Sequence, residues 1–266
     1  LFPVTRASRH LAMYEPSTEA LTHISTCFGT HHLMFAEDED NTLWTSGGGQ
    51  VIGWFDTKRF LETGDEEQSQ GWTALVLDTN GNGRRDGYTE PDEPIDPSRD
   101  HRVTSGFYGV AVNPVDGTIW GSSLGFPGAI LRLDPGVDPA TTALTEVFEV
   151  PWENPRAEVQ GYSPRGMDID RNGVVWTPLA SGHMASFDRR KCVGPLNGPE
   201  ASGQHCPEGW TLYPEPLPQI KGLDDSGSAE GSYYTWVDQF DILGLGANVP
   251  INTGNASEGL LALQDG

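Results

Sequence analysis

Five side chains capable of acid–base or anion-binding chemistry stand at comparable places along this sequence. They are His31, Tyr108, Arg165, His183 and Glu258. An imidazole serves as a base near neutral pH, a guanidinium holds a carboxylate or an oxyanion, and a phenol donates a hydrogen bond. We therefore expect His31 or His183 to act as a general base, Tyr108 and Arg165 to bind an anionic ligand, and Glu258 to position a metal.

These residues sit on an internal repeat that explains why they could meet. Residues 31–56, 108–134 and 165–188 each contain an alternating apolar stretch, a turn with Asp, Asn or Gly, a second stretch with a tryptophan, and a third stretch that ends in Asp. The tryptophans are Trp44, Trp120 and Trp176. A fourth apolar stretch follows each copy, and Trp72 and Trp210 lie in two of them. Repeated four-stranded antiparallel units with fixed Gly and Trp positions are typical of β-propeller blades.

The expected fold is therefore all-β, a β-propeller of four-stranded antiparallel blades with long loop insertions, forming a single domain over residues 1–266. Blades are predicted to begin near 31, 108 and 165. A partial blade is expected over residues 1–26 and another from 257. Because both partial blades lack strands, the sequence is interpreted as a fragment, or a processed form, of a larger propeller.

The propeller geometry predicts where the reactive side chains meet. The loops that lead into the innermost strands and the loops between second and third strands open on the same face, around the central channel. Aligning the copies puts His31, Tyr108, Arg165 and Glu258 at equivalent places before innermost strands, and His183 in a second-to-third-strand loop. Adjacent strand residues point to opposite faces, so His31 and His32 are not expected to serve one metal together. The alternative is that these side chains only brace turns and neighbouring blades.

One loop has the oxygen spacing of a calcium site. Asp78, Asn80, Asn82 and Asp86 occupy positions 1, 3, 5 and 9, with glycine at position 6. Thr89 replaces the glutamate of position 12. The expected ligand set, with Arg84 included at position 7, would hold a structural calcium ion; the alternative is a polar turn rich in Asn and Gly.

Cysteine spacing and charge limit the location and the partners. Cys192 and Cys206 bracket a Gly/Pro-rich loop and are expected to form a disulfide, with Cys27 unpaired; a bridge predicts a secreted or periplasmic protein.

The 38 acidic residues against 16 basic ones give a net charge of −22, which disfavours nucleic acid as a partner. No apolar run approaches membrane-spanning length, so no membrane insertion is expected. The remaining partners are a small-molecule ligand or other protein chains.

Short motifs in the repeat resemble those of the streptogramin (virginiamycin B) lyase family. They are Gly-Val-Ala-Val at 109–112, Leu-Asp-Pro-Gly at 133–136 and Asp-x-x-Gly-x-Val-Trp-Thr at 170–177. The resemblance implies a propeller that eliminates across an ester carbon–oxygen bond with histidines, a glutamate and magnesium at the channel mouth. Two functions from different classes remain open: a lyase or hydrolase, and a non-enzymatic binding or structural propeller with calcium-stabilised insertions.

Overall fold

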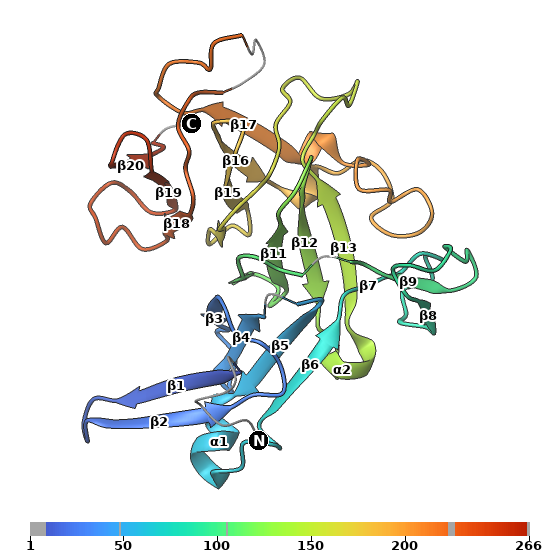
Figure 1. The fold of residues 1–266 in the computed structure, drawn as a ribbon, viewed down its shortest axis with the longest axis vertical. Helices are drawn as coiled ribbons and strands as arrows, with labels where there is room; N and C mark the ends of the chain where they lie inside the picture. Colours follow the sequence, from blue (N-terminus) through green and yellow to red (C-terminus); the bar gives the residue numbers. More distant parts are fainter. Residues whose placement is uncertain (1–8, 48, 105, 223–226, 265–266) are drawn as a thin grey trace.

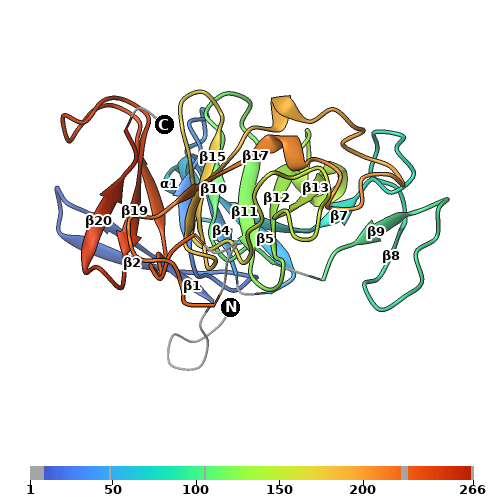
Figure 2. The same cartoon turned by 90° about the horizontal axis from the view of Figure 1, so that it is seen from above.

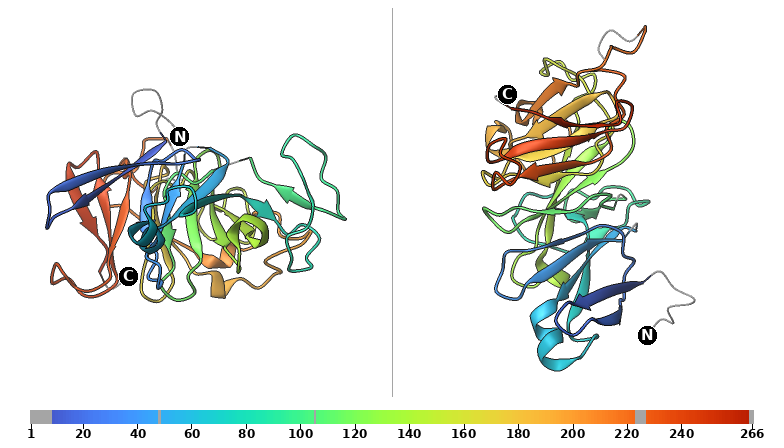
Figure 3. Two further views of the ribbon diagram at one scale, coloured as in Figure 1. Left: turned by 90° about the horizontal axis from the view of Figure 1, so that it is seen from below. Right: turned by 90° about the vertical axis from the view of Figure 1, so that its left-hand side faces the viewer.

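The computed structural model describes residues 9–47, 49–104, 106–222 and 227–264, and it confirms the all-β propeller architecture. Antiparallel sheets follow one another along the chain, as Figure 1 shows from the blue N-terminal sheets to the red C-terminal one. The right-hand view of Figure 3 shows the same succession from the side.

The first sheets contain two and four strands. A hairpin is formed by β1 (His10–Glu15) and β2 (Ala20–Ser25). The next sheet has the order β3 (Leu33–Phe35), β4 (Thr42–Ser46), β5 (Val51–Asp56) and β6 (Gln70–Ala74). Trp72 therefore lies on an outermost strand, as predicted.

The second blade is extended by an insertion. Its own strands are β10 (Ala111–Val112), β11 (Ile119–Ser123), β12 (Ala129–Asp134) and β13 (Leu144–Glu149). Beyond β13 the sheet continues with β7 (Val76–Leu77), β9 (Asp100–Arg102) and β8 (Tyr88–Thr89), which belong to the segment between two blades. Figure 2 shows β8 and β9 on the opposite side of the molecule from the C-terminal strands. The predicted calcium loop is therefore at the outer edge of this sheet.

The third blade is complete, and a three-stranded sheet follows it. The blade has the order β14 (Asp168–Ile169), β15 (Val175–Leu179), β16 (His183–Phe187) and β17 (Trp210–Pro214). The last sheet has the order β18 (Thr235–Asp238), β19 (Val249–Gly254) and β20 (Gly259–Ala262).

The last sheet corrects one expectation. Residues 259–262 were predicted to open a new blade from 257, but they form β20, which pairs with β19 in a tight hairpin closed by Gly254 and Gly259. The innermost strand of this sheet is β18, which starts at Thr235. The sequence pattern does not reveal this strand, because Tyr233 and Tyr234 precede it. In the second and third copies, a glycine stands before the innermost strand.

Helices are few and short. They are α1 (Thr57–Thr63), α2 (Pro139–Thr142) and the 3-10 turns η1 (Arg189–Lys191) and η2 (Pro207–Gly209). Within the described residues no helix is long and apolar enough to cross a membrane.

The terminal aspartate of each repeat turns the chain after the third strand. Asp56 caps α1 by accepting the Arg59 N–H at 2.8 Å. Asp188 caps η1 through the Arg190 N–H, and Asp134 accepts the Gly136 N–H. A carboxylate that satisfies free N–H groups stabilises a turn or helix start by roughly 0.5–2 kcal/mol. The repeated aspartate is thus a local structural device.

The hydrophobic core lies between neighbouring blades. One cluster joins the second and third blades through the rings of Trp120, Phe148 and Phe187. Another joins the first and second blades and includes Ile52 and Leu131. Each blade therefore stabilises the next one, which fixes the relative positions of the inner strands.

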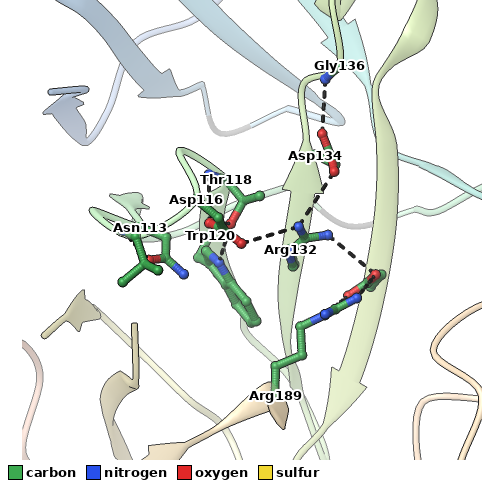
Figure 4. A network of polar contacts seen from close by, with 10 residues as sticks. Asn113, Asp116, Thr118, Trp120, Arg132, Asp134, Gly136 and Arg189 are labelled. Atoms are coloured by element: carbon green, nitrogen blue, oxygen red, sulfur yellow. Dashed lines mark hydrogen bonds and ion pairs between the residues drawn. The ribbon is translucent and has the colours of Figure 1, made fainter. Parts of the chain in front are cut away.

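A buried ion-pair network reinforces the contact between the second and third blades (Figure 4). The Glu146 carboxylate is 5% exposed and accepts two hydrogen bonds from the Arg189 guanidinium, at 2.6 and 2.7 Å. It also pairs with Arg132 at 3.3 Å, and Arg132 reaches Asp116 and Asp134. Because Glu146 and Arg132 belong to one blade and Arg189 to the next, the network ties the blades together.

Candidate functional site at the channel mouth

The residues before the innermost strands are held by the second strand of their own blade. The His31 N–H donates to the Ser46 carbonyl at 2.7 Å, and the Tyr108 N–H donates to the Ser122 carbonyl at 2.7 Å. The Arg165 N–H donates to the Pro178 carbonyl at 3.1 Å. The same backbone pairing in three blades puts these three residues at one end of the inner strands.

The Ser46 hydroxyl joins two blades at this end. It accepts the His32 N–H at 3.1 Å and donates to the Tyr108 carbonyl at 3.0 Å. The histidine segment of the first blade is therefore fixed against the tyrosine of the second.

Aromatic rings from three sheets converge here. The His31 and His32 ring centres lie 5.4 and 5.1 Å from that of Tyr108. Tyr108 meets Tyr233 edge-on at 6.0 Å, and His32 lies 5.4 Å from Tyr234. We call His31, His32, Tyr108, Arg165, Tyr233 and Tyr234 the mouth cluster. Both histidines belong to it because β3 begins only at Leu33, so the strand alternation expected to separate them does not apply.

Arg165 completes the mouth cluster from the third blade. Its guanidinium carbon lies 5.0 Å from the centre of the Tyr233 ring, so the cation rests on an aromatic face. Within the described part of the chain, no carboxylate lies within ion-pair distance of this guanidinium. The side chain is only half-buried, so its N–H groups can reach a ligand.

Tyr234 can occupy this place because its neighbour is a glycine. A Cβ atom on Gly166 would lie 2.0 Å from Cδ2 of the Tyr234 ring. The Gly166 backbone also pairs with the last sheet, through hydrogen bonds to the Tyr233 carbonyl and from the Thr235 N–H. Gly166 therefore allows the third blade and the last sheet to approach closely beneath Arg165.

Burial sets the protonation states in the mouth cluster. Burial, and then a hydrogen bond and charge interaction with Tyr233, raises the pKa of Tyr108 to about 12. Burial, and then the neighbouring His31, lowers the pKa of His32 below its ordinary value. Tyr108 therefore keeps its O–H as a donor at physiological pH, and His32 is neutral there. The Nε2 atom of His32 is buried without a hydrogen-bond partner.

A cavity of about 470 Å³ lies at the opposite end of the inner strands from the mouth cluster, and no side chain of the mouth cluster lines it. Its lining includes Met34, Trp44, Val112, Asp168, Trp236 and Phe240. Asp168 is a buried carboxylate of its lining, held by N–H donors of Ile169 and Val237, and Glu37 and Asp38 also line the cavity. Burial raises the pKa of Asp168 to about 6, and burial, and then the Asp168 charge, raises the pKa of Tyr234. A cavity of this volume is in the range that encloses small ligands.

Two of the predicted site residues lie elsewhere. His183 begins β16, is 2% exposed, and has its Nδ1 atom 3.0 Å from the Ser181 hydroxyl, under the backbone of Gly227. Burial lowers its pKa to about 4. Glu258 is an exposed turn residue between β19 and β20, with a positive φ of 55°. The place assigned to it before an innermost strand belongs to Tyr233, because Tyr234 makes the backbone contacts that His32 and Gly109 make in their blades.

Sequence reasoning missed Tyr233, Tyr234, Asp168 and the participation of His32. The alternating stretch Tyr234-Thr235-Trp236-Val237-Asp238, in which Thr235 and Val237 are buried, was the available signal for the innermost strand. Asp168 is the polar residue within the short apolar strand β14. A polar residue in such a strand is a sign that the strand borders a channel.

The predicted disulfide is present. Cys192 and Cys206 are bridged, with their Cα atoms 5.0 Å apart, and Cys27 is free and exposed. The bridge closes the loop between η1 and η2, on the outer side of the third blade.

Comparison with known proteins shows likeness at the level of the fold. No protein-family model and no curated protein sequence matches this chain. Among solved structures, it resembles a streptogramin B lyase at 11% identity and a TM-score of 0.52, over 97% of this chain and 62% of the lyase. It also resembles PorZ, described as an essential bacterial surface component of the type-IX secretion system of Porphyromonas gingivalis, at 11% identity and a TM-score of 0.52, over 97% of this chain and 29% of PorZ. This chain thus spans less than two thirds of either protein, and the relationship shown is a distant, propeller-like one.

Proposed function

We propose that the mouth cluster binds a small anionic ligand, with Arg165 as the cationic anchor and Tyr108 as a neutral hydrogen-bond donor. The observation that carries the proposal is the placement of Arg165 on the Tyr233 ring without a carboxylate partner among the described residues. In a protein with a net charge of −22, an arginine left without an acidic partner is available to an external anion.

The aromatic rings support binding of an organic anion rather than an inorganic ion alone. Tyr108, Tyr233 and Tyr234 supply apolar ring faces in the mouth cluster, beside the guanidinium. A carboxylate attached to an apolar body matches this combination of surfaces.

Titration with benzoate, acetate and inorganic phosphate, followed by calorimetry, tests the proposal. We expect saturable binding, with benzoate tighter than acetate, and a loss of at least tenfold in affinity in Arg165→Gln. Arg59→Gln is the matched control, because Arg59 lies exposed on α1 and its replacement removes the same charge. Equal affinities in wild type and Arg165→Gln would contradict the proposal. They would favour the alternative that Arg165 only braces neighbouring blades.

One observation favours a second, catalytic candidate function of the same mouth cluster. A general base requires a neutral nitrogen free to accept a proton, and His32 is a neutral imidazole whose buried Nε2 atom has no hydrogen-bond partner. A rotation of the side chain would expose this nitrogen to a substrate. In an ester elimination, the base takes the proton from the carbon next to the one that carries the ester oxygen. The carbon–oxygen bond then breaks to give an alkene and a carboxylate, and Arg165 would stabilise that carboxylate.

Magnesium does not fit the mouth cluster. Magnesium prefers oxygen ligands, chiefly carboxylates and water. The cluster offers imidazoles, phenols and a guanidinium, whose positive charge opposes a cation, and Glu258 lies outside it. No step of the elimination is therefore derived through magnesium.

Turnover of a streptogramin B, followed by chromatography, tests the catalytic candidate. A product that forms with wild type and at least a hundred times more slowly with His32→Gln would support it, and His23→Gln, an exposed histidine on β2, is the control. Equal turnover in wild type and His32→Gln would contradict it.

We also propose that the protein is exported. The disulfide supports this location, since such bridges persist in oxidising compartments. The likeness to PorZ, a bacterial surface component, is compatible with it.

A further inference from the structure

The insertion between the first two blades holds three aspartates around one short loop. Asp78 opens the loop, Asp86 stands at its ninth position, and Asp100 approaches from β9. The Asp78 carboxylate accepts N–H bonds from Gly81, Asn82 and Gly83, at 2.8 to 3.1 Å, so the loop curls around it. This loop is separate from the mouth cluster, and the inference does not rest on the proposed function.

Asp100 is the observation that points to a ligand. Its side chain is fully buried, and its Oδ1 atom has no hydrogen-bond partner. Its other oxygen accepts the Asp86 N–H at 2.6 Å, which directs the carboxylate toward the loop. A buried carboxylate oxygen without a partner is destabilising because its desolvation is not compensated, and a cation would compensate it.

Strand register explains why Asp100 is available. The parallel pairing of β8 and β9 sets Tyr88 beside Asp100 and Thr89 beside His101. Thr89, at position 12, turns its hydroxyl to the His101 ring at 2.8 Å. Thr89 therefore points away from the loop, and β9 brings the Asp100 carboxylate to the loop instead.

The amide side chains of Asn80 and Asn82 also face this interior. Both donate to the same oxygen of Asp86, at 3.1 and 2.5 Å. Within the described residues, no three His, Cys, Asp or Glu side chains already stand at metal-binding distances from one point, because these amides and the loop N–H groups occupy the carboxylates. An ion would replace the amide N–H groups, and a rotation of each amide would present its oxygen.

We propose that this loop binds one calcium ion, and that Asp100 of β9 supplies the acidic ligand that position 12 lacks. Asp78, Asn80, Asn82 and Asp86 supply side-chain oxygens, and Arg84 supplies its backbone carbonyl at position 7. Hard oxygen ligands in a flexible loop with several carboxylates are what calcium selects.

The ion would stabilise two insertions at once. The Gly198 N–H, inside the disulfide-closed loop, donates to the Asp78 carbonyl at 2.8 Å, and Gly81 packs against Gly198. Arg85 anchors the other side of the calcium loop on Thr73 of β6 at 2.8 Å. Calcium at Asp78 therefore fixes the junction between the loop, the disulfide segment and the first blade.

Calorimetric titration of the EDTA-treated full chain with calcium chloride is the test. We expect one ion per chain in wild type, at least tenfold weaker binding in Asp100→Asn, and unchanged binding in Asp92→Asn. Asp92 is an exposed aspartate of the same insertion, so its replacement is matched in charge and in shape. Wild type that binds no calcium, or Asp100→Asn that binds as wild type does, would overturn the proposal.

Thermal unfolding separates ligation from a purely structural role of Asp100. Without calcium, Asp100→Asn should unfold at the wild-type temperature or above it, because asparagine still accepts the Asp86 N–H and removes a repelling charge. With calcium, wild type and Asp92→Asn should gain the same stability, and Asp100→Asn should gain less at the same calcium concentration. If Asp100→Asn does not fold, a crystal structure of wild type with calcium decides: an Asp100 oxygen about 2.3–2.6 Å from the ion supports the proposal, and a longer separation overturns it.

Discussion

The Arg165 guanidinium lies 5.0 Å from the ring centre of Tyr233, although the two residues belong to different sheets. The contact forms where the Gly166 backbone pairs with the last sheet. It places a cation on one edge of a group of phenol and imidazole rings, against Tyr233.

Tyr108→Phe should weaken anion binding without unfolding the protein. The substitution keeps the ring that packs against His32 and Tyr233 and removes only the O–H donor. The expected loss is about 1 kcal/mol of binding free energy, close to fivefold in affinity. Calorimetric titration with benzoate measures it, and Tyr14→Phe, on the exposed face of β1, is the control. Unchanged affinity in Tyr108→Phe would remove the phenol from the site.

His183 should make folding stability depend on pH. Burial lowers its pKa to about 4 from an ordinary value of 6.5. Between these values the unfolded chain binds a proton that the folded chain does not, so stability falls as the pH drops. The full loss from pH 7 to below pH 4 is about 3 kcal/mol.

Urea unfolding of wild type and His183→Gln at several pH values measures this contribution. The difference in unfolding free energy between the two proteins should change by that amount, in favour of the variant at low pH. His23→Gln, an exposed histidine, should show no such change. A constant difference across the pH range would show that His183 is not buried in its neutral form.

Much of the fold follows from local patterns, whereas the site depends on contacts between sheets. The repeat predicts the inner and outer strands, because the alternation of apolar and polar residues and the aspartates of the turns act locally. Asp170 is an example: it accepts hydrogen bonds from the Asn172 and Val174 N–H groups and from the Trp176 indole N–H. The last sheet was misassigned because β18 and β19 are joined by the irregular loop 239–248, which does not repeat the short turn of the other copies. Glu258 was therefore placed before a first strand, whereas it precedes β20, the third strand of its sheet.

The positions of Tyr233 and Asp100 could not be read from the sequence for a related reason. Tyr233 joins the mouth cluster through pairing of the third blade with the last sheet, and Asp100 reaches the loop through a parallel pairing of β8 with β9. Both depend on which segments become neighbours in space. No local spacing encodes either contact.

Glu146→Gln should be strongly destabilising. The change removes the buried partner of the Arg132 guanidinium, whose side chain is 10% exposed, and leaves it only the exposed carboxylates of Asp116 and Asp134. It also weakens the bond to Arg189. Breaking a buried ion pair costs about 3–5 kcal/mol. Urea unfolding should show this loss in Glu146→Gln and almost none in the exposed control Glu158→Gln. A loss below about 1 kcal/mol would mean that the network behaves as a surface ion pair.

Removing the disulfide should destabilise the chain by about 3 kcal/mol. The bridge closes a loop with a sequence separation of 14, and opening such a loop restores chain entropy to the unfolded state. The double variant Cys192→Ser, Cys206→Ser should show the loss in urea unfolding, whereas Cys27→Ser should not. Equal stability of the double variant and wild type would contradict a structural role of the bridge.

The most direct test of the central claim is an anomalous-scattering map from crystals soaked in selenate, a divalent anion that marks cationic sites. We expect a selenium peak within hydrogen-bonding distance of the Arg165 guanidinium, beside Tyr108 and Tyr233, that is lost in Arg165→Gln. Selenium peaks at other arginines and none at Arg165, with its guanidinium held by a carboxylate of the protein, would contradict it.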